Sequence, residues 1–340
     1  MTSPIQLVDF FSGCGGTSLG LQQAGFDVIA GVDLDPYAAA TFRHNFPDAT
    51  FLERDVRDLV PGDISPMLDR RPVAFAGCAP CQPFSIQNRQ RDLGDPRRGL
   101  LAQFQRFVME LRPEYVIVEN VAGAQRLDES GTFQEFMSAL CALGYAVDAG
   151  VLRAGDFGVP QERRRLVILG ALSVGVSLPT APLGGARRDA TVRQVIGHLP
   201  KLAAGEVDRA DPDHAAMRLS PVNLERIRAT PEGGGRNDWP PRLRLECHEG
   251  HSGHSDVYGR MRWDRPASGL TTRCLSYSNG RFGHPEQDRA ISAREAACLQ
   301  TFPESFRFMG PLTEKGRQIG NAVPPALARR IGAGIMATRG

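Results

Sequence analysis

The sequence predicts an α/β protein in which a doubly wound, mostly parallel sheet is joined to a second, smaller, loop-rich domain. Up to about residue 170, short apolar runs alternate with amphipathic segments. From Ser173 onward, proline, glycine and arginine become dense and the periodicity fades, until regular patterns return at Ser292. We therefore expect one domain at residues 1–175, a small domain at 176–290, and a return of 291–340 that completes the first domain.

Each predicted strand is a short apolar run bounded by polar or turn-forming residues. The strands are expected at residues 5–11, 27–32, 50–53, 73–77, 115–118, 146–152 and 166–172. Helices are expected at 100–111 and 133–143, where apolar residues recur at three and four positions. Ser292 and Glu295 have capping-box spacing, and a last helix follows Pro324 and Pro325. Such a sheet binds ligands beyond the carboxyl ends of its strands.

The composition, 41% hydrophobic and 23% charged over 340 residues, indicates a globular protein without long disordered stretches. The chain has neither a long apolar run nor a signal-like N-terminus, so we expect a cytoplasmic protein without membrane contact. Seven scattered cysteines are expected to be reduced thiols. The net charge of +2 neither demands nor excludes a polyanionic partner. Nearly all basic residues are arginine, which suits phosphate and guanine, although a GC-rich genome is an alternative explanation.

A glycine-rich turn at residues 12–16 follows the first strand and opens a helix, so its backbone can approach a ligand. Ser18 stands where the dinucleotide fingerprint has its third glycine, and a pyrophosphate cofactor is therefore not supported. Asp33 and Asp55 end the next two strand regions, where a carboxylate can accept hydrogen bonds from ribose hydroxyls. The alternative is that both acids only cap helices. The pattern suits a nucleoside without phosphates.

A candidate nucleophile, Cys81, lies on the loop after the fourth strand. Pro80 and Pro83 flank it closely, which would fix and expose the thiol, whereas structural cysteines usually lie inside apolar runs. Cys78 and Cys81 also have the C-x-x-C spacing of a redox pair or of half a zinc site. The sequence has no second cysteine pair to complete such a zinc site, and we expect no metal there.

Six segments, in this order, resemble the motifs of the bacterial-type cytosine-5 DNA methyltransferase family. They are DFFSGCGGTSLGLQQAGF, GCAPCQPFS, VENV, VPQERRR, DRPASGLTTR and QIGNAVPP, and they span almost the whole chain. The resemblance implies a Rossmann-like methyltransferase that transfers methyl from S-adenosylmethionine to C5 of a cytosine in a specific sequence of double-stranded DNA. Two alternatives remain, a tRNA cytosine-5 methyltransferase and a catalytically silent DNA-binding regulator. The arginine-rich variable region argues against the first, and intact catalytic motifs argue against the second.

The resemblance also assigns the S-adenosylmethionine site, mostly to residues at strand ends. These residues are Phe11, Gly13, Cys14, Gly15, Gly16, Asp33, Leu34, Asp55, Val56, Pro80, Leu101, Asn321 and Val323. The family more often has glutamate where Asp33 stands, so we expect a shorter or water-mediated ribose contact. Cys78 and Ala79 stand where Gly-Pro or similar is usual, and no change of chemistry is expected from this difference.

The implied mechanism begins with addition of the Cys81 thiolate to C6, because C5 of cytosine is a poor nucleophile. Glu119 is assigned to protonate or hydrogen-bond N3, a role that needs a protonated carboxyl, and Asn120 to hold the neighbouring backbone. Arg163 and Arg165 alternate along a segment predicted to be extended, so they should share a face. In the family these arginines hold the flipped base and the adjacent phosphate; a solvated strand edge is the alternative.

Residues 82–99 are polar and aperiodic, as expected of a lid that closes over DNA once the target base is flipped out. Residues 176–260 match no motif and are expected to recognise the target sequence. The predicted DNA contacts are Ser85, Gln87, Arg89, Arg91, Gln161, Arg242, Arg244 and Thr271. Cys247 lies near His248, His251 and His254, but glycines and serines interrupt this cluster and no metal is predicted. We expect a monomer that binds double-stranded DNA, with a cognate restriction endonuclease as a separately acting partner.

Overall fold

The computed structural model describes residues 3–79, 99–123, 131–181, 190–248 and 256–339. The chain divides into two compact units. Unit 1 consists of Met1–Arg153, Arg164–Leu183 and Val323–Gly340, and unit 2 of Ala154–Arg163 and Gly184–Ala322. This division differs from the predicted domains. Residues 291–340 were expected to belong to the first domain, but only Val323–Gly340 belongs to unit 1. The division also assigns Ala154–Arg163 to unit 2.

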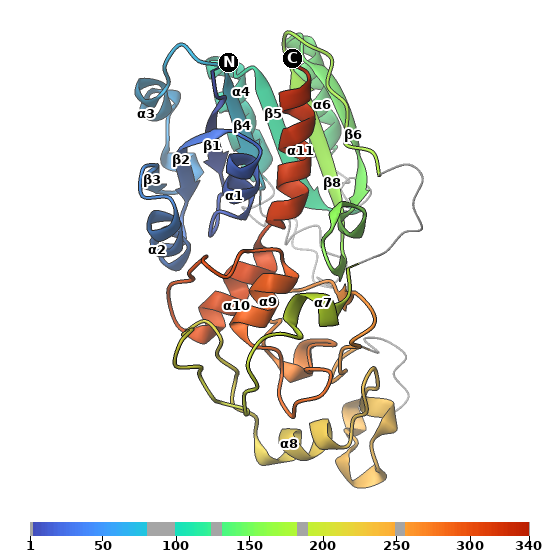
Figure 1. The fold of residues 1–340 in the computed structure, drawn as a ribbon. Helices are drawn as coiled ribbons and strands as arrows, with labels where there is room; N and C mark the ends of the chain where they lie inside the picture. Colours follow the sequence, from blue (N-terminus) through green and yellow to red (C-terminus); the bar gives the residue numbers. More distant parts are fainter. Residues whose placement is uncertain (1–2, 80–98, 124–130, 182–189, 249–255, 340) are drawn as a thin grey trace. The chain divides into compact units, whose positions relative to one another are not determined.

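Among the described residues, unit 1 contains a seven-stranded sheet with strand order β3-β2-β1-β4-β5-β8-β6 (Figure 1). All seven predicted strands are present. They are β1 (Gln6–Phe10), β2 (Asp27–Asp33), β3 (Thr50–Glu53), β4 (Val73–Gly77), β5 (Tyr115–Val121), β6 (Ala146–Arg153) and β8 (Arg164–Ala171). The first five run parallel, and β8 is antiparallel to both of its neighbours. The strand order reverses between β1 and β4, which makes their carboxyl ends the place where such sheets bind ligands.

Helices cover both faces of this sheet. Phe10 of β1 lies on one face, with its ring centroid 5.3 Å from those of Phe75 and Phe104. This face is covered by α3 (Pro61–Ile64), α4 (Leu100–Leu111) and α6 (Thr132–Ala142). The other face is covered by α1 (Gly16–Gln23), α2 (Pro36–Asn45) and α11 (Pro325–Ala337). A Cβ on Gly20 would lie 2.3 Å from the Pro325 carbonyl oxygen, so glycine lets α1 and α11 pack closely.

Unit 2 is rich in loops, as the proline and glycine content predicts. Its regular elements are α7 (Val192–Ile196), α8 (Pro221–Arg228), α9 (Ala293–Leu299), α10 (Leu312–Asn321) and the paired strands β7 (Gln161–Glu162) and β9 (Ala267–Ser268). The predicted capping box of Ser292 and Glu295 begins α9, which packs against α7 and α10.

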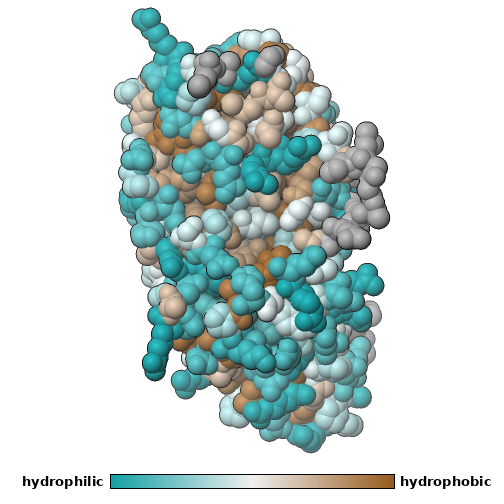
Figure 2. Space-filling view, viewed as in Figure 1, coloured by the Kyte–Doolittle hydropathy of each residue, from teal (hydrophilic) through white to brown (hydrophobic). Residues whose placement is uncertain are grey.

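Hydrophilic residues predominate on the face seen in Figure 2, with apolar residues scattered among them. Within the described chain, no helix is long and apolar enough to cross a membrane.

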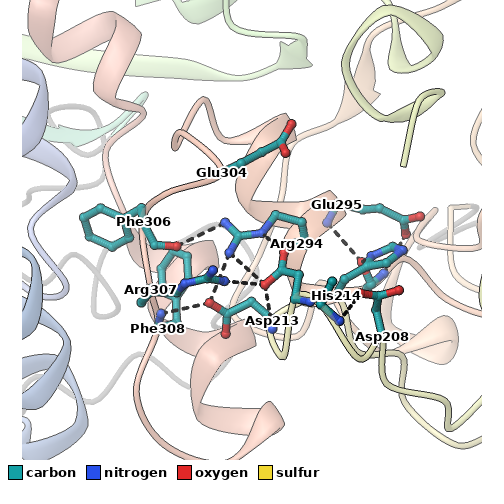
Figure 3. Close-up of polar contacts among 12 residues, drawn as sticks. Asp208, Asp213, His214, Arg294, Glu295, Glu304, Phe306, Arg307 and Phe308 are labelled. Carbon is teal, nitrogen blue, oxygen red and sulfur yellow. Dashed lines mark hydrogen bonds and ion pairs between the residues drawn. The ribbon is translucent and has the colours of Figure 1, made fainter. Parts of the chain in front are cut away.

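A network of buried charges stabilises unit 2 in addition to a small apolar cluster around Trp239. Arg294 is fully buried, lies 2.5 Å from an Asp211 carboxylate oxygen and 3.3 Å from one of Asp213, and donates to the Phe306 carbonyl (Figure 3). The Lys315 ammonium lies 2.5 Å from the other Asp213 oxygen. Buried charges are tolerated only when they are paired and hydrogen-bonded, so this network fixes the loop at 211–213 against α9 and α10.

Candidate functional site

The turn after β1 has a backbone conformation typical of ligand sites. Phe11 has a φ angle of 57°, which bulky residues rarely adopt, and Gly13 and Gly15 follow at 53° and 94°. A Cβ on Gly15 would lie 2.4 Å from the Phe46 ring, so only glycine fits there. A Cβ on Gly13 would meet no described atom within 4 Å. The turn therefore leaves space beside Gly13 at the N-terminal end of α1.

Asp33, at the end of β2, is held against this turn. One carboxylate oxygen accepts a hydrogen bond from the Gly13 N–H at 2.8 Å, and the other accepts one from the Asp35 N–H at 3.0 Å. Burial raises the pKa of Asp33, against the opposing effect of these bonds. Asp35, not Asp33, caps α2 by accepting from Tyr37 and Ala38. The capping alternative therefore does not hold for Asp33, whose oxygens each keep a lone pair for a ligand.

Asp55, which follows β3, has different partners from Asp33. Asp55 caps the short 3-10 turn Val56–Asp58, and its carboxylate lies 2.6 Å from the Arg57 guanidinium. These hydrogen bonds from Arg57 lower the pKa of Asp55. Asp55 therefore caps this turn, and its contact with the cofactor stays a prediction. Leu34, between Asp33 and α2, has 62% of its surface exposed, which is unusual for leucine. An apolar surface thus adjoins the buried carboxylate, whereas Val56 and Leu101 are buried.

Asp9 of β1 is a buried acid that the sequence analysis did not single out, although an acid within the apolar run IQLVDFF is an available signal. Its side chain is fully buried, and the Ser18 hydroxyl donates to one oxygen at 2.6 Å. The other oxygen has no hydrogen-bond partner among the described residues. Burial raises the pKa of Asp9 to about 7. A buried acid with a free lone pair therefore lies in the strand that leads into the turn.

Cys78, directly after β4, is not a competing nucleophile. Its sulfur lies 3.4 Å from the Thr17 hydroxyl of α1. Burial raises the pKa of this thiol well above its usual value, and the charges of Glu119 and Asp9 act in the same direction. Because the thiolate is the reactive form, Cys78 is poorly reactive near neutral pH.

Two of the predicted catalytic side chains, Glu119 and Arg165, form an ion pair near the carboxyl end of β5, and a third, Asn120, follows Glu119 in the strand. The Arg165 Nε lies 2.6 Å from a Glu119 carboxylate oxygen, and the two side chains are 15% and 11% exposed. The antiparallel register places Arg165 opposite Val121, two residues from Glu119 and on the same face. Asn120 is buried, and its amide donates to the Ala79 carbonyl at 3.2 Å. This bond ties β5 to the residue that precedes Pro80.

Arg163 and Arg165 are two residues apart where the chain enters β8, and the buried Arg163 lies between the exposed residues Glu162 and Arg164. That the two arginines share a face stays a prediction. The Arg163 N–H donates to the Gln161 carbonyl at 2.9 Å, so the chain turns at Glu162, before β8 begins. Arg163 is the last residue of its segment in unit 2, and unit 1 resumes at Arg164. The guanidinium of Arg163 is buried and donates to three backbone carbonyls, those of Leu270, Gly320 and Ala322. These bonds connect segments of unit 2, and the catalytic role of Arg163 stays a prediction.

The predicted contact between Gln161 and DNA conflicts with the position of this side chain. This side chain is fully buried. Its amide nitrogen donates to the Leu299 carbonyl and to the Gln300 side chain, and its oxygen accepts from the Leu270 N–H. Because no part of the amide faces solvent, Gln161 connects segments of unit 2 and does not reach DNA.

The other predicted DNA residues of unit 2 are accessible to different degrees. Arg242 is 69% exposed and lies 2.6 Å from a Glu225 oxygen, and Arg244 donates to the Trp239 carbonyl. Thr271 is half-buried. Asn321 ends α10 in unit 2, whereas Val323 belongs to unit 1. The predicted residues outside the described part of the chain are Pro80, Cys81, Ser85, Gln87, Arg89, Arg91, His251 and His254.

Comparisons with known proteins identify the family. The family model for C-5 cytosine-specific DNA methylase matches residues 5–337. The chain is 41% identical over 336 residues to the Type II methylase M.HgiDII of Herpetosiphon aurantiacus, which covers 97% of this chain and 94% of that one. It is 37% identical over 332 residues to the Type II methyltransferase M1.HphI of Haemophilus parahaemolyticus, with coverage of 97% and 86%.

The chain is also similar to solved structures of methyltransferases. A protein described as a prophage-encoded DNA modification methyltransferase (E. coli) matches with a TM-score of 0.78 at 25% identity, over 98% of this chain and 99% of that one. The Entamoeba histolytica methyltransferase EhMeth matches with a TM-score of 0.68 at 14% identity, over 99% of both chains. The second of these supports the fold alone. The present chain belongs to the C-5 cytosine-specific DNA methylase family.

Proposed function

We propose that this protein transfers a methyl group from S-adenosylmethionine to C5 of a flipped-out cytosine in a specific sequence of double-stranded DNA. The observation that carries the proposal is the sheet edge where Glu119 and Arg165 form an ion pair. On the same edge, Asn120 holds the backbone next to the Cys81 loop. Cytosine inside a duplex cannot present C6 to a thiol, so the base must leave the helix.

The ends of β1 and β2 fit an adenosyl group. Asp33 offers carboxylate lone pairs for ribose hydroxyls, Gly13 leaves open space beside it, and Leu34 offers an apolar surface for a flat ring. The strained Phe11 backbone supports a ligand role for the same turn. When bound, S-adenosylmethionine supplies an electrophilic methyl group on its sulfonium sulfur.

The protein's own residues would activate the base. The Cys81 thiolate forms a bond to C6 while N3 takes a proton from Glu119, and the C5–C6 π electrons make C5 nucleophilic. The ion pair with Arg165 positions the Glu119 side chain, whose carboxylate must take up a proton before it can give one to N3. Once C5 carries the methyl group, loss of the C5 proton returns an electron pair to the ring and expels the Cys81 thiolate. The proton on N3 then returns to Glu119.

Covalent trapping tests the nucleophile. Bisulfite sequencing of DNA from a host that expresses the protein should first reveal one methylated sequence, and tRNA sequenced in the same way tests the alternative substrate. A duplex with 5-fluorocytosine at that position should then form a denaturation-resistant adduct with the wild type. Cys81→Ala should form none, while Cys78→Ala, the matched control, should still form it. An adduct with Cys81→Ala would show that Cys81 is not the nucleophile.

Glu119 should lower the barrier to attack on C6 without holding DNA. Glu119→Gln keeps the shape of the side chain but loses the acid, so turnover should fall by roughly a hundredfold or more. Duplex affinity, measured by fluorescence anisotropy, should remain within about twofold. Comparable losses in both quantities would make Glu119 a DNA-binding residue instead.

The Type II names of the relatives support a role beside a restriction endonuclease that reads the same sequence. DNA from the expressing host should then resist an endonuclease that cuts at the methylated sequence. Cleavage at fully methylated sites would contradict a protective role.

A further inference from the structure

Unit 2 contains a pocket of about 240 Å³ that none of the predicted roles uses. Met261, Arg262 and residues 265–268 form part of its wall, and Gly233 and Arg281 form another part. Three arginines line it, and no acidic side chain is among the described residues that do so. The pocket is therefore electropositive, and its walls come from segments that are separate in the sequence.

Arg281, one of these arginines, stabilises the wall of the pocket. Arg281 donates to the carbonyls of Gly233 and Gly234 at 2.8 Å each, and its Nε lies 3.2 Å from an Asp256 oxygen. Gly233 has a φ angle of 70°, and a Cβ there would lie 2.3 Å from the Arg262 Nε. The stem of Arg262 thus lies directly against this glycine. The pocket wall is preformed, and Asp256 offsets the charge of Arg281.

The other two arginines are available to a ligand. Arg262 and Arg265 are exposed, and within the described chain neither guanidinium forms a hydrogen bond or an ion pair. The Ser268 hydroxyl is buried in the same wall and has no hydrogen-bond partner among the described residues. Guanidinium groups are donors only, and a hydroxyl can donate as well. This set of donors matches an oxyanion that accepts from several sides.

We propose that this pocket binds one phosphodiester group of the DNA backbone, an inference that rests on the proposed function. A pocket of this size admits a phosphate with adjoining sugar atoms but no pair of stacked bases. Contacts to phosphate fix the register and orientation of a duplex without reading its sequence. Arg262 and Arg265 therefore position the DNA, while other side chains of unit 2 read the bases.

Salt-dependent binding of the full chain to its duplex tests the pocket. Arg262→Gln and Arg265→Gln should each weaken binding about tenfold on cognate and non-cognate duplexes alike. Each should also reduce the slope of log affinity against log salt by about one. Arg209→Gln is the matched control, since Arg209 is an exposed arginine of the same unit that does not line the pocket. Pocket variants that bind like this control, or that change the methylated sequence, would overturn the proposal.

A neutral backbone substitution tests the ligand directly. A single methylphosphonate, moved stepwise along the duplex, should weaken wild-type binding about tenfold at one position. The double variant Arg262→Gln/Arg265→Gln should show no further loss at that position. Equal losses in both proteins at every position would refute a phosphate in this pocket. Thermal unfolding of each variant confirms that it is folded.

The two proposals fail separately, because neither binding test requires methyl transfer. A chain that binds duplex DNA but methylates no cytosine contradicts the proposed function alone. A chain that methylates its site, with pocket variants that bind like the wild type, contradicts the pocket alone.

Discussion

The sheet edge of unit 1 and the loops of unit 2 accommodate buried charge in opposite ways. In unit 1, Asp9 and Asp33 are bonded to a hydroxyl and to backbone amides, and burial raises the pKa of both. In unit 2, the buried Arg260 donates to backbone carbonyls and lies 2.6 Å from Asp288. The two acids of unit 1 are thus held by neutral donors, whereas many arginines of unit 2 are used by the fold itself. Counting arginines therefore overstates how many can reach DNA.

The largest effect expected from this comparison is at Arg260. Arg260→Met should lower the free energy of unfolding by about 3–5 kcal/mol, because it leaves buried carbonyls and Asp288 without their donor. Arg262→Gln, two residues away and exposed, should change it by less than about 0.5 kcal/mol. Urea denaturation of both variants measures the difference. Similar stabilities would mean that the buried arginines are not structural and that the comparison fails.

The next effect is a pH dependence of stability that originates in Asp9. The unfolded chain releases this proton near pH 3.8, but the folded chain releases it only near pH 7. Between these values the folded state holds a proton that the unfolded state has lost, so stability falls as pH rises towards 7. Asp9→Asn does not titrate, so its stability relative to wild type should rise between pH 4 and 8 by up to about 4 kcal/mol. Parallel stability curves for the two proteins would show that Asp9 titrates normally.

The fold was predictable because each strand of the sheet is a local apolar run. The run at residues 73–77 coincides with β4, and α4 has its predicted bounds. The positions of Asp33 and Glu119 were predictable as well, because a parallel sheet brings the carboxyl ends of its strands to one edge. Their hydrogen-bond partners were not, since these depend on register and on turns distant in the sequence.

The errors have specific physical causes. Alternation predicts which side chains share a face only where the chain stays extended, and the turn at Glu162 separates the buried Gln161 from the two arginines that follow it. Residues 291–340 were expected to complete the first domain, but a helical pattern shows only that one face is buried, not which neighbour covers it. In the structure, α9 packs within unit 2. Asp9 was not singled out, although an acid within the apolar run IQLVDFF is itself a signal of a special position.

The smallest stability effect, and the sharpest test of the comparison, is at Arg242. This arginine is exposed and pairs only with the exposed Glu225, so Arg242→Gln should change the free energy of unfolding by less than about 1 kcal/mol. If it reads a guanine through two hydrogen bonds, the same change should weaken binding to the cognate duplex by about 1–3 kcal/mol. Non-specific binding should change much less, which distinguishes this arginine from a phosphate contact. Affinity for cognate and scrambled duplexes, with bisulfite maps of the methylated sites, gives the answer. Equal weakening on both duplexes would place Arg242 with Arg262 and Arg265, and the bases would then be read elsewhere in unit 2.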